Sequence, residues 1–258
     1  MLNISVVVTT YNRPDALELV LNALAAQTQL PNEVIVADDG SSKSTTELIS
    51  KLQTLLPYSL LHFWQEDNGF QAAKARNKAV EISHGEYLIF IDGDCIPQID
   101  FIKKHSQLAE KSCFVAGNRI LLSKNFTAQL NSPIWNWSKL QWVLPYLRRD
   151  INRFLPLLRL PVKLLSKHHK KKWQGAKTCN LAVWRDDFEK IKGFDENYQG
   201  WGHEDADLVV RLLCNTVLRK DGRFAVPVFH LWHPEADRGN EKENRQRLDN
   251  IINKALNS

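Results

Sequence analysis

The sequence predicts an α/β fold built on a mostly parallel, Rossmann-like sheet with helices on both faces. Strands of such a sheet are buried on both sides, so they occur as continuous apolar runs. Residues 4–9, 33–37 and 86–91 form three runs of this kind. Stretches with helical spacing lie between them, and this alternation of strand and helix is typical of a doubly wound sheet.

Start and stop signals predict the helices of this first part of the chain. Pro14 begins the first helix and Pro31 ends it. Ser44 is the predicted cap of the second. A short strand at 60–64 and a third helix at 70–83 complete this part.

After residue 95 the pattern is less regular and contains no internal repeat. The expected elements are a helix at 101–112, a strand at 113–122, a loop and strand at 175–183, a helix at 203–214, a strand at 224–231 and a polar helix from residue 241. We therefore predict a single domain, 1–258, with a nucleotide-binding half at 1–95. The other half, 96–258, would bind the acceptor and carry the catalytic residues.

Length and composition indicate a globular enzyme-sized chain. Its 258 residues are 43% apolar and 24% charged, enough to bury a substantial core. The four cysteines are scattered without a C-x-x-C pair, which indicates reduced thiols and not a disulfide framework or a zinc site. The first apolar run is too short for a signal peptide, and no stretch approaches the ~20 apolar residues of a membrane-spanning helix. We expect the protein to be cytoplasmic, and the inner face of the membrane is one site in the cytoplasm where it would act.

The positive charge of the chain is concentrated in one segment. The formal net charge is +5, and residues 132–173 contain ten Lys or Arg against a single acid, Asp150. That segment carries +9, so the remainder carries −4. This distribution argues against nucleic acid as a partner and describes a mildly acidic enzyme with one local basic feature.

Three polar clusters follow three of the predicted strands, at residues 9–13, 38–42 and 92–94. In a parallel α/β sheet, ligands bind beyond the carboxyl ends of the strands. We therefore expect these clusters to meet at one rim and to form the functional site.

Acidic residues at this rim have a functional and a structural interpretation. Asp92 and Asp94, with a glycine between them, suit a divalent cation that bridges to a diphosphate, and oxygen ligands favour Mg²⁺ or Mn²⁺ over zinc. The alternative is an ordinary acidic turn, because a lone D-x-D triplet arises by chance. Asp38 or Asp39 would accept a hydrogen bond from a base or ribose, or would only stabilise the turn that they begin.

A later stretch combines an aromatic residue with acids. Glu204 and Asp205 lie in the first turn of an apolar helix, where acids also complement the helix dipole. Trp201 stands between two glycines, and its ring offers a flat face for a sugar, while a neighbouring carboxylate would take a proton from a hydroxyl. His230 and His233 end the last predicted strand, where they would complete a metal site or serve only the structure.

Several of these stretches together resemble family 2 glycosyltransferases of the GT-A fold. They are Thr9-Thr10-Tyr11-Asn12-Arg13-Pro14, Asp38-Asp39-Gly40-Ser41, Ala75-Arg76-Asn77 and Asp92-Gly93-Asp94. Gly200-Trp201-Gly202-His203-Glu204-Asp205, followed by Asp207, resembles the C-terminal motif of β-1,4-galactosyltransferases and bacterial chondroitin- and hyaluronan-type synthases. The resemblance covers nearly the whole chain except 132–173. Some relatives have a glycine at the position of His203, which bears on the identity of donor or acceptor.

The resemblance implies roles for the residues on the donor side. Thr9 and Asp39 would contact the nucleobase, and Arg76 would contact the nucleotide. Asp92 and Asp94 would form the metal motif, with Asp94 as the direct ligand. A downstream histidine of the family matches His233, which His230 would assist.

It also implies roles on the acceptor side. Asp205 matches the catalytic base, and Glu204 would hold the acceptor or donor sugar. Trp201 belongs to the same motif and would line the sugar site. Asn180 lies in a loop that resembles the donor-binding Gly-x-Asn region, although Gly175 lies further upstream here.

The implied reaction is a single displacement with inversion at the anomeric carbon of a UDP-sugar, dependent on Mn²⁺ or Mg²⁺. Asp205 would take the proton of the acceptor hydroxyl, and metal and cations would stabilise the departing nucleoside diphosphate. The acceptor would be a glycan or glycolipid of lipopolysaccharide or capsule synthesis, by analogy with bacterial relatives. A sugar nucleotidyltransferase is an alternative, but the glycine-rich first loop of those enzymes is absent here. A basic membrane or nucleic-acid adaptor would leave the three rim clusters without a role.

Segment 132–173 interleaves its cations with Trp135, Trp137, Trp142, Tyr146, Phe154 and Trp173. Such a mixture suits peripheral binding to an anionic membrane, where each cation contributes about 1 kcal/mol. The alternative is a basic lid that packs its aromatic rings into the protein and points its charges at the donor phosphate. Membrane binding predicts sedimentation with anionic vesicles, weakened by salt and by replacing Lys170, Lys171 and Lys172 with Glu.

Overall fold

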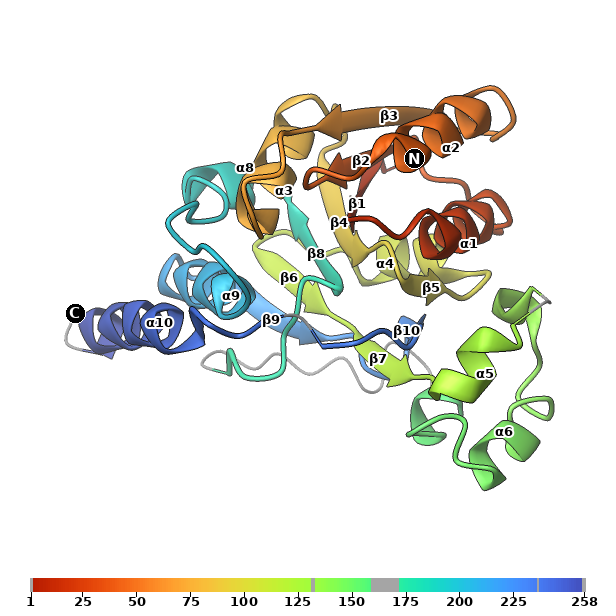
Figure 1. Ribbon diagram of the computed structural model, residues 1–258. Coiled ribbons are helices and arrows are strands. Elements are labelled where there is room, and N and C mark those ends of the chain that lie inside the picture. The colour runs from red at the N-terminus through yellow and green to blue at the C-terminus, as the bar shows by residue number, and fades with distance from the viewer. Residues whose placement is uncertain (1, 131–132, 159–171, 236, 257–258) are drawn as a thin grey trace.

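The computed structural model describes residues 2–130, 133–158, 172–235 and 237–256. Its central layer is a seven-stranded sheet with the order β3-β2-β1-β4-β8-β6-β9 (Figure 1). The strands are β1 (Ile4–Thr10), β2 (Glu33–Asp38), β3 (Ser59–Trp64), β4 (Tyr87–Asp92), β6 (Cys113–Ala116), β8 (Asn180–Trp184) and β9 (Leu218–Asp221). Only β8 runs against its neighbours, so the mostly parallel sheet predicted from the sequence is confirmed.

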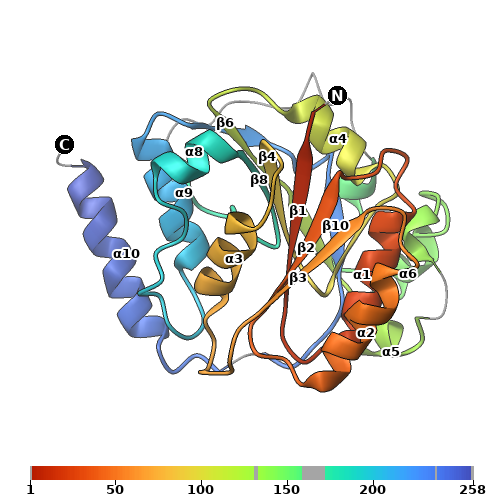
Figure 2. The ribbon, with the colours of Figure 1, turned by 90° about the horizontal axis from the view of Figure 1, so that it is seen from above.

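Helices cover both faces of this sheet, as predicted (Figure 2). One face carries α1 (Pro14–Ala25), α2 (Lys43–Gln53) and α4 (Phe101–Leu108), and the other carries α3 (Ala72–Glu81), α8 (Arg185–Lys190) and α9 (Glu204–Cys214). Successive side chains of a strand point to opposite faces. In β1, Val6 and Val8 therefore join the core that contains α1 and α2, whereas Val7 joins the core that contains α3.

A second, three-stranded sheet lies beside the first and was not predicted. Its order is β5-β10-β7, with β5 (Cys95–Pro97), β7 (Asn118–Leu121) and β10 (Pro227–His230). The strand predicted at 113–122 is in fact broken at Gly117, so that β6 and β7 belong to different sheets. The chain can turn there because Gly117 has no side chain: a Cβ would lie 2.2 Å from the Asn180 amide.

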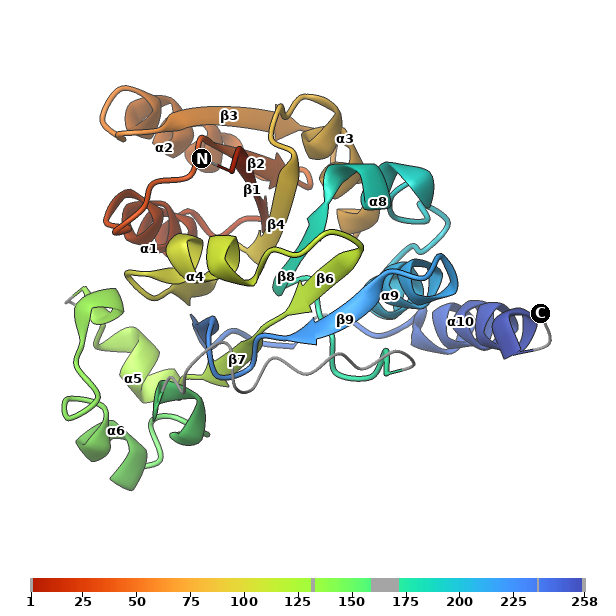
Figure 3. The ribbon, with the colours of Figure 1, turned by 180° about the vertical axis from the view of Figure 1, so that it is seen from behind.

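The chain after β7 forms short helices that project away from the seven-stranded sheet (Figures 1 and 3). They are α5 (Lys124–Ala128), η1 (Ile134–Asn136), α6 (Val143–Leu147) and η2 (Leu155–Leu158). The C-terminal helix α10 (Glu241–Leu256) packs on α9 at the other end of the molecule. No helix in the described part of the chain has the length and apolar character needed to cross a bilayer.

Two local predictions were wrong. Ser42, and not Ser44, precedes α2, and its side chain makes no capping hydrogen bond. Strand β9 was not predicted, because its sequence, Leu-Arg-Lys-Asp, has no apolar pattern. It pairs with β6 through its backbone, and this pairing does not depend on residue type.

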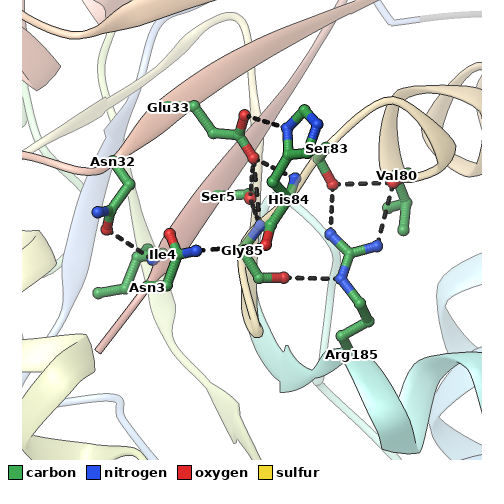
Figure 4. Close-up of polar contacts among 10 residues, drawn as sticks. All are labelled: Asn3, Ile4, Ser5, Asn32, Glu33, Val80, Ser83, His84, Gly85 and Arg185. Carbon is green, nitrogen blue, oxygen red and sulfur yellow. Dashed lines mark hydrogen bonds and ion pairs between the residues drawn. The ribbon is translucent and has the colours of Figure 1, made fainter. Parts of the chain in front are cut away.

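A polar network joins the amino ends of the parallel strands (Figure 4). The Glu33 carboxylate accepts hydrogen bonds from the Ser5 hydroxyl, at 2.6 Å, and from the backbone N–H of His84. Arg185 donates to the carbonyl of Gly85 at 2.7 Å. Burial alone would raise the pKa of Glu33, but the hydrogen bonds from His84 and Ser5 outweigh it and lower this pKa. The network is therefore a satisfied, structural one.

Candidate active site

A cavity of about 830 Å³ opens at the carboxyl ends of the parallel strands. Residues of the three rim clusters border it together with residues from the second half of the chain. The predicted residues at its wall are Thr9, Asp39, Arg76, Asp92, Asp94, Trp201, Glu204, Asp205, His230 and His233. The predicted convergence of the clusters on one rim therefore holds, and Asn180 is the exception discussed below.

Arg76 lies in the middle of α3 and connects three of these elements. Its guanidinium donates to Thr9 Oγ1 at 2.9 Å, to Asp92 Oδ1 at 3.3 Å and to Glu204 Oε1 at 3.3 Å. Only 4% of the residue is exposed. The sequence suggested a contact between Arg76 and the nucleotide, but in this structure its donors are directed at the protein. Arg76 thus acts first as a positioning residue that fixes β1, β4 and α9 relative to one another.

The carboxylates around Arg76 outnumber its single charge. Burial, opposed by Arg76 and reinforced by Asp94, raises the pKa of Asp92 to about 6. Burial and the nearby Asp205 likewise raise the pKa of Glu204 to about 7. Both shifts show that the ionised carboxylates are disfavoured in the cavity, and a bound cation would relieve the repulsion between them.

Asp94 meets His230 and His233 at the edge of the cavity. The two imidazoles place Nε2 at 3.7 Å and 3.2 Å, respectively, from oxygens of the Asp94 carboxylate. The small sheet brings them together, since His230 pairs with Cys95 and the backbone N–H of Leu231 donates to the Asp94 carbonyl at 2.9 Å. One ligand atom from each of the three residues lies within 4.8 Å of the others, which is close enough for one metal ion.

The hydrogen bonding of His233 fits a metal ligand. Its Nδ1 lies 2.6 Å from the carbonyl oxygen of Pro234, and a carbonyl only accepts, so Nδ1 carries the proton. In the neutral imidazole, Nε2 then presents a lone pair to the Asp94 carboxylate. A carboxylate oxygen and an imidazole nitrogen 3.2 Å apart share either a proton on Nε2 or a bound cation. Burial lowers the pKa of His230, which favours the neutral, ligating form of that ring as well.

This group combines oxygen and nitrogen donors. One carboxylate and two imidazoles suit Mn²⁺ better than Mg²⁺, which prefers oxygen ligands almost exclusively. Asp92 does not belong to the group: one of its oxygens is hydrogen bonded to Arg76, and its carboxylate instead clusters with Cys95 and Cys179. Asp94 is thus the acid of the Asp-Gly-Asp stretch that is placed to ligate directly.

The Trp201 loop depends on an unusual backbone. Gly200 and Gly202 have φ angles of +71° and +106°, and His203, which precedes α9, has a φ of +75°. Glycine adopts positive φ angles readily because it has no side chain. The backbone of this loop therefore explains why a glycine stands on each side of Trp201. The half-buried Trp201 ring borders the cavity, and the Arg238 guanidinium lies 4.5 Å from its centroid.

The first turn of α9 places its two acids differently. Asp205 borders the cavity and accepts a hydrogen bond from the backbone N–H of Thr178 at 3.3 Å. Glu204 is bound to Arg76 through Oε1, but its buried Oε2 has no hydrogen-bond partner among the described residues. A buried carboxylate oxygen without a partner is costly, and a ligand hydroxyl would satisfy it.

Asp39 follows β2 and borders the same cavity. Its two oxygens accept from Gln65 Nε2 at 2.6 Å and from the backbone N–H of Gln71 at 2.7 Å. Burial raises the pKa of Asp39 despite these bonds. Each carboxylate oxygen has a second lone pair, so Asp39 is still able to accept from a base or ribose.

Asn180 does not reach the cavity. Its amide is 2% exposed and donates to the carbonyls of Asn118, at 3.1 Å, and Val226. It connects β8 to the small sheet, and we therefore leave it out of the proposed donor site.

Two cations at the cavity were missed by the sequence analysis. Arg119 on β7 and Lys177 both border it, and neither side chain has a hydrogen-bond or ion-pair partner among the residues that the structure describes. Arg119 lay within a predicted strand and Lys177 within a predicted loop, so no local pattern singled them out. Unpaired cations beside a metal group suit a diphosphate.

Comparisons with known families agree with this geometry. Residues 5–170 match glycosyl transferase family 2, and residues 159–220 match the N-terminal domain of galactosyltransferase. The first match contains the rim clusters, and the second contains the Trp201–Asp205 stretch. The family 2 match also continues through most of the basic segment 132–173.

Related sequences come from several bacteria. The chain is 31% identical over 220 residues to validoxylamine A glucosyltransferase of Streptomyces hygroscopicus subsp. limoneus, covering 81% of this chain and 47% of that protein. It is 28% identical over 243 residues to chondroitin synthase of Pasteurella multocida (strain Pm70), covering 83% of this chain and 23% of that protein. The chain thus spans half or less of the length of these relatives.

Solved structures share the fold at low identity. The mannosyltransferase PcManGT of Pyrobaculum calidifontis, in complex with GDP-Man and Mn²⁺, superposes with a TM-score of 0.64 at 19% identity, covering 99% of this chain and 64% of that one. TarS 1–349 of S. aureus in complex with UDP gives 0.62 at 16% identity, covering 97% and 65%. Both are GT-A glycosyltransferases, so the GT-A architecture predicted from the sequence is confirmed.

Proposed function

Because this chain belongs to glycosyl transferase family 2, we propose that it transfers a sugar from a UDP-sugar to a hydroxyl of a glycan or glycolipid, with inversion and with help from a divalent metal. One observation carries the proposal: a single cavity has the Asp94–His230–His233 group at one edge and the Glu204–Asp205 turn at another. A reaction that moves a sugar from a diphosphate to a hydroxyl needs one site that binds the phosphates and one group that accepts the hydroxyl proton.

The donor would lie along the carboxyl ends of β1, β2 and β4. Residues 1–95 would hold the nucleotide, with Thr9 and Asp39 near the base. Asp94, His233 and His230 would hold Mn²⁺, or less suitably Mg²⁺, which supplies positive charge to the diphosphate. Arg119 and Lys177 would add further positive charge as the diphosphate departs. TarS has been solved with UDP and PcManGT with GDP-Man, so GDP-sugars should be tested beside UDP-sugars.

The acceptor would be bound by residues of 96–258. Asp205 accepts the proton of the acceptor hydroxyl as that oxygen forms its bond to the anomeric carbon. The bond from the anomeric carbon to the β-phosphate oxygen breaks on the opposite side, and UDP leaves with the electron pair. Glu204 would hold a sugar hydroxyl through its unpartnered Oε2, and Trp201 would cover an apolar sugar face.

Donor binding is the first test of this function. UDP with Mn²⁺ should raise the melting temperature, and a screen of UDP-sugars should reveal hydrolysis or transfer that releases UDP. A sugar nucleotidyltransferase would instead release pyrophosphate from UTP, and an adaptor would not be stabilised by UDP. Glucose transfer and chondroitin synthesis both occur among the named relatives, so the screen should include several sugars.

The biological setting forms a further part of the proposal. Polysaccharide synthases among the relatives support a role in capsule or lipopolysaccharide synthesis. The ten cations of segment 132–173 support peripheral association with a membrane face, where a glycolipid acceptor would be met. Lys170 and Lys171 lie outside the described residues, so the vesicle experiment must test whether they contribute to membrane binding.

A further inference from the structure

The projection that contains α6 presents an apolar surface to solvent, which we call the leucine face. It consists of Leu140, Val143, Leu144, Leu147 and Leu155. Leu140 is 82% exposed, Leu147 71% and Leu155 65%. Single exposed leucines are ordinary, but five aliphatic residues within sixteen positions of one projection are not.

The tryptophans of the same segment point the other way. Trp142 is 1% exposed and stacks on Phe229 of β10 with ring centroids 4.2 Å apart. Trp137 lies 4.9 Å from Trp142 and packs against the same core. The burial of Trp142 agrees with the alternative drawn from the sequence, in which the aromatic rings pack into the protein, because this ring fills the space between the projection and the small sheet. These rings anchor the projection and leave its leucines outside.

Exposed cations lie on the same projection as the leucine face. Lys139, Arg148, Arg149 and Arg153 are all exposed on the same projection. The only acid of residues 133–158, Asp150, accepts a hydrogen bond from the Ser123 hydroxyl at 2.9 Å. The surface therefore combines aliphatic side chains with net positive charge, which complements an anionic lipid headgroup layer above an acyl region.

The projection is attached directly to the cavity wall. The backbone N–H of Trp232 donates to Thr127 Oγ1 in α5 at 3.0 Å, and Lys124 lies 4.9 Å from the centroid of the Trp232 ring. Leu122 bridges to Ile151 across the base of the projection. Trp232 and Leu122 both border the cavity next to His233. A surface bound by the leucine face would thus lie at a fixed position relative to the active site.

We propose that the leucine face docks on an anionic phospholipid surface, with its aliphatic side chains in the interfacial region and its cations against the headgroups. This assigns the membrane association to residues 139–155 and to leucines, in place of tryptophans. Docking would bring the active site to a lipid-linked acceptor, and this part of the inference rests on the proposed function. A second copy of the chain is a poorer occupant, because it would bring two cationic faces together.

Vesicle sedimentation with a triple variant tests the proposal. Wild-type protein should sediment with vesicles of phosphatidylglycerol and phosphatidylcholine at low salt, and should bind pure phosphatidylcholine less. Leu140→Ser, Leu144→Ser and Leu147→Ser together should weaken the partition coefficient at least about tenfold. The matched control replaces three aliphatic residues that are exposed elsewhere, Leu30→Ser, Leu55→Ser and Ile82→Ser, and should bind as the wild type does.

Each result decides the matter. Wild-type protein that stays in the supernatant, or a triple leucine variant that binds as tightly as its control, overturns the docking of the leucine face. Dimers that the leucine substitutions dissociate, without vesicle binding, would identify a second copy as the occupant instead. Stabilisation by UDP and Mn²⁺ is measured on every variant in parallel. If UDP and Mn²⁺ do not stabilise the wild-type protein, the proposed function is refuted. The vesicle result would still test the docking of the leucine face.

Discussion

The two ends of the central strands treat buried glutamates in opposite ways. Glu33, at the amino ends, and Glu204, at the carboxyl ends, are each 6% exposed. Hydrogen bonds lower the pKa of Glu33 despite its burial (Figure 4), whereas burial and Asp205 raise that of Glu204 to about 7. Solvent exposure is the same, but Glu204 lies deeper among protein atoms, lies beside a second acid and has fewer hydrogen-bond partners than Glu33. A buried acid that its own protein leaves unsatisfied is a candidate for binding or catalysis.

The arginines at the two ends repeat the contrast. Arg185 donates to the neutral carbonyls of Gly85 and Val80, and so it stabilises the connection between β4 and β8. Arg76 donates instead to the acids Asp92 and Glu204, whose negative charge it offsets only in part. The amino end is thus complete without a ligand, whereas the carboxyl end leaves its acids only partly neutralised and Glu204 Oε2 without a partner among the described residues. Substitutions at the two ends should therefore separate activity from stability.

The largest expected effect is on activity and arises at the metal group. EDTA should abolish transfer and Mn²⁺ should restore it. Asp94→Ala should lower turnover by about ten-thousandfold or more, since a metal contributes roughly 5 kcal/mol or more to such a barrier. The melting temperature should change by no more than about 3 °C, because Asp94 serves the ligand and not the fold. Full activity in the chelator would refute the role of the metal.

Asp205→Asn should affect turnover next most strongly. The amide keeps the size of the side chain but cannot accept the proton, so we expect a loss of roughly two to four orders of magnitude. Stabilisation by UDP and Mn²⁺ should persist, because Asp205 serves the acceptor. Steady-state kinetics beside a thermal-shift assay would check both statements. A loss of less than about tenfold would point to a different base.

Glu33→Gln should have the opposite pattern of effects: it should lower the free energy of unfolding and leave turnover unchanged. Loss of charge-assisted hydrogen bonds should lower the free energy of unfolding by about 1.5–3 kcal/mol at pH 7. The folded-state pKa of Glu33 lies below its unfolded value of about 4.3, so its contribution is complete above that pH and is lost as the pH falls through the folded pKa. The gap between wild type and variant in urea unfolding should therefore narrow below about pH 4. An equal gap at all pH values would contradict this account.

The smallest effect is expected at His203, where the backbone has a φ of +75°. Glycine would remove roughly 1–2 kcal/mol of strain but adds freedom to the unfolded chain, so His203→Gly should raise stability by less than about 1 kcal/mol. The His203 side chain makes no capping hydrogen bond that would be lost. His203→Ala keeps the Cβ and should bring no gain, which makes it the matched control in thermal unfolding. A destabilised glycine variant would show that the His203 ring itself supports the loop.

Local patterns were enough to predict the framework and much of the site. Continuous apolar runs identified β1, β2 and β4, and the polar residues that follow them had to meet because parallel strands end at one rim. The same reasoning placed Asp94 and Asp39 at the cavity. The family resemblance added Arg76, for which periodicity and spacing offered no signal, and it identified Asp205 as the base among the two acids that begin the apolar helix.

Tertiary structure decided what depends on contacts between distant residues. His230 and His233 reach Asp94 only because β10 pairs with β5, more than 120 positions earlier in the chain, and no local pattern encodes such a pairing. Arg119 became a cavity residue when Gly117 allowed the chain to change sheets. In segment 132–173, the sequence determined the mixture of rings, leucines and cations. Which of them faces water was decided by packing: Trp142 found Phe229, and the leucines had no partner left within the described residues.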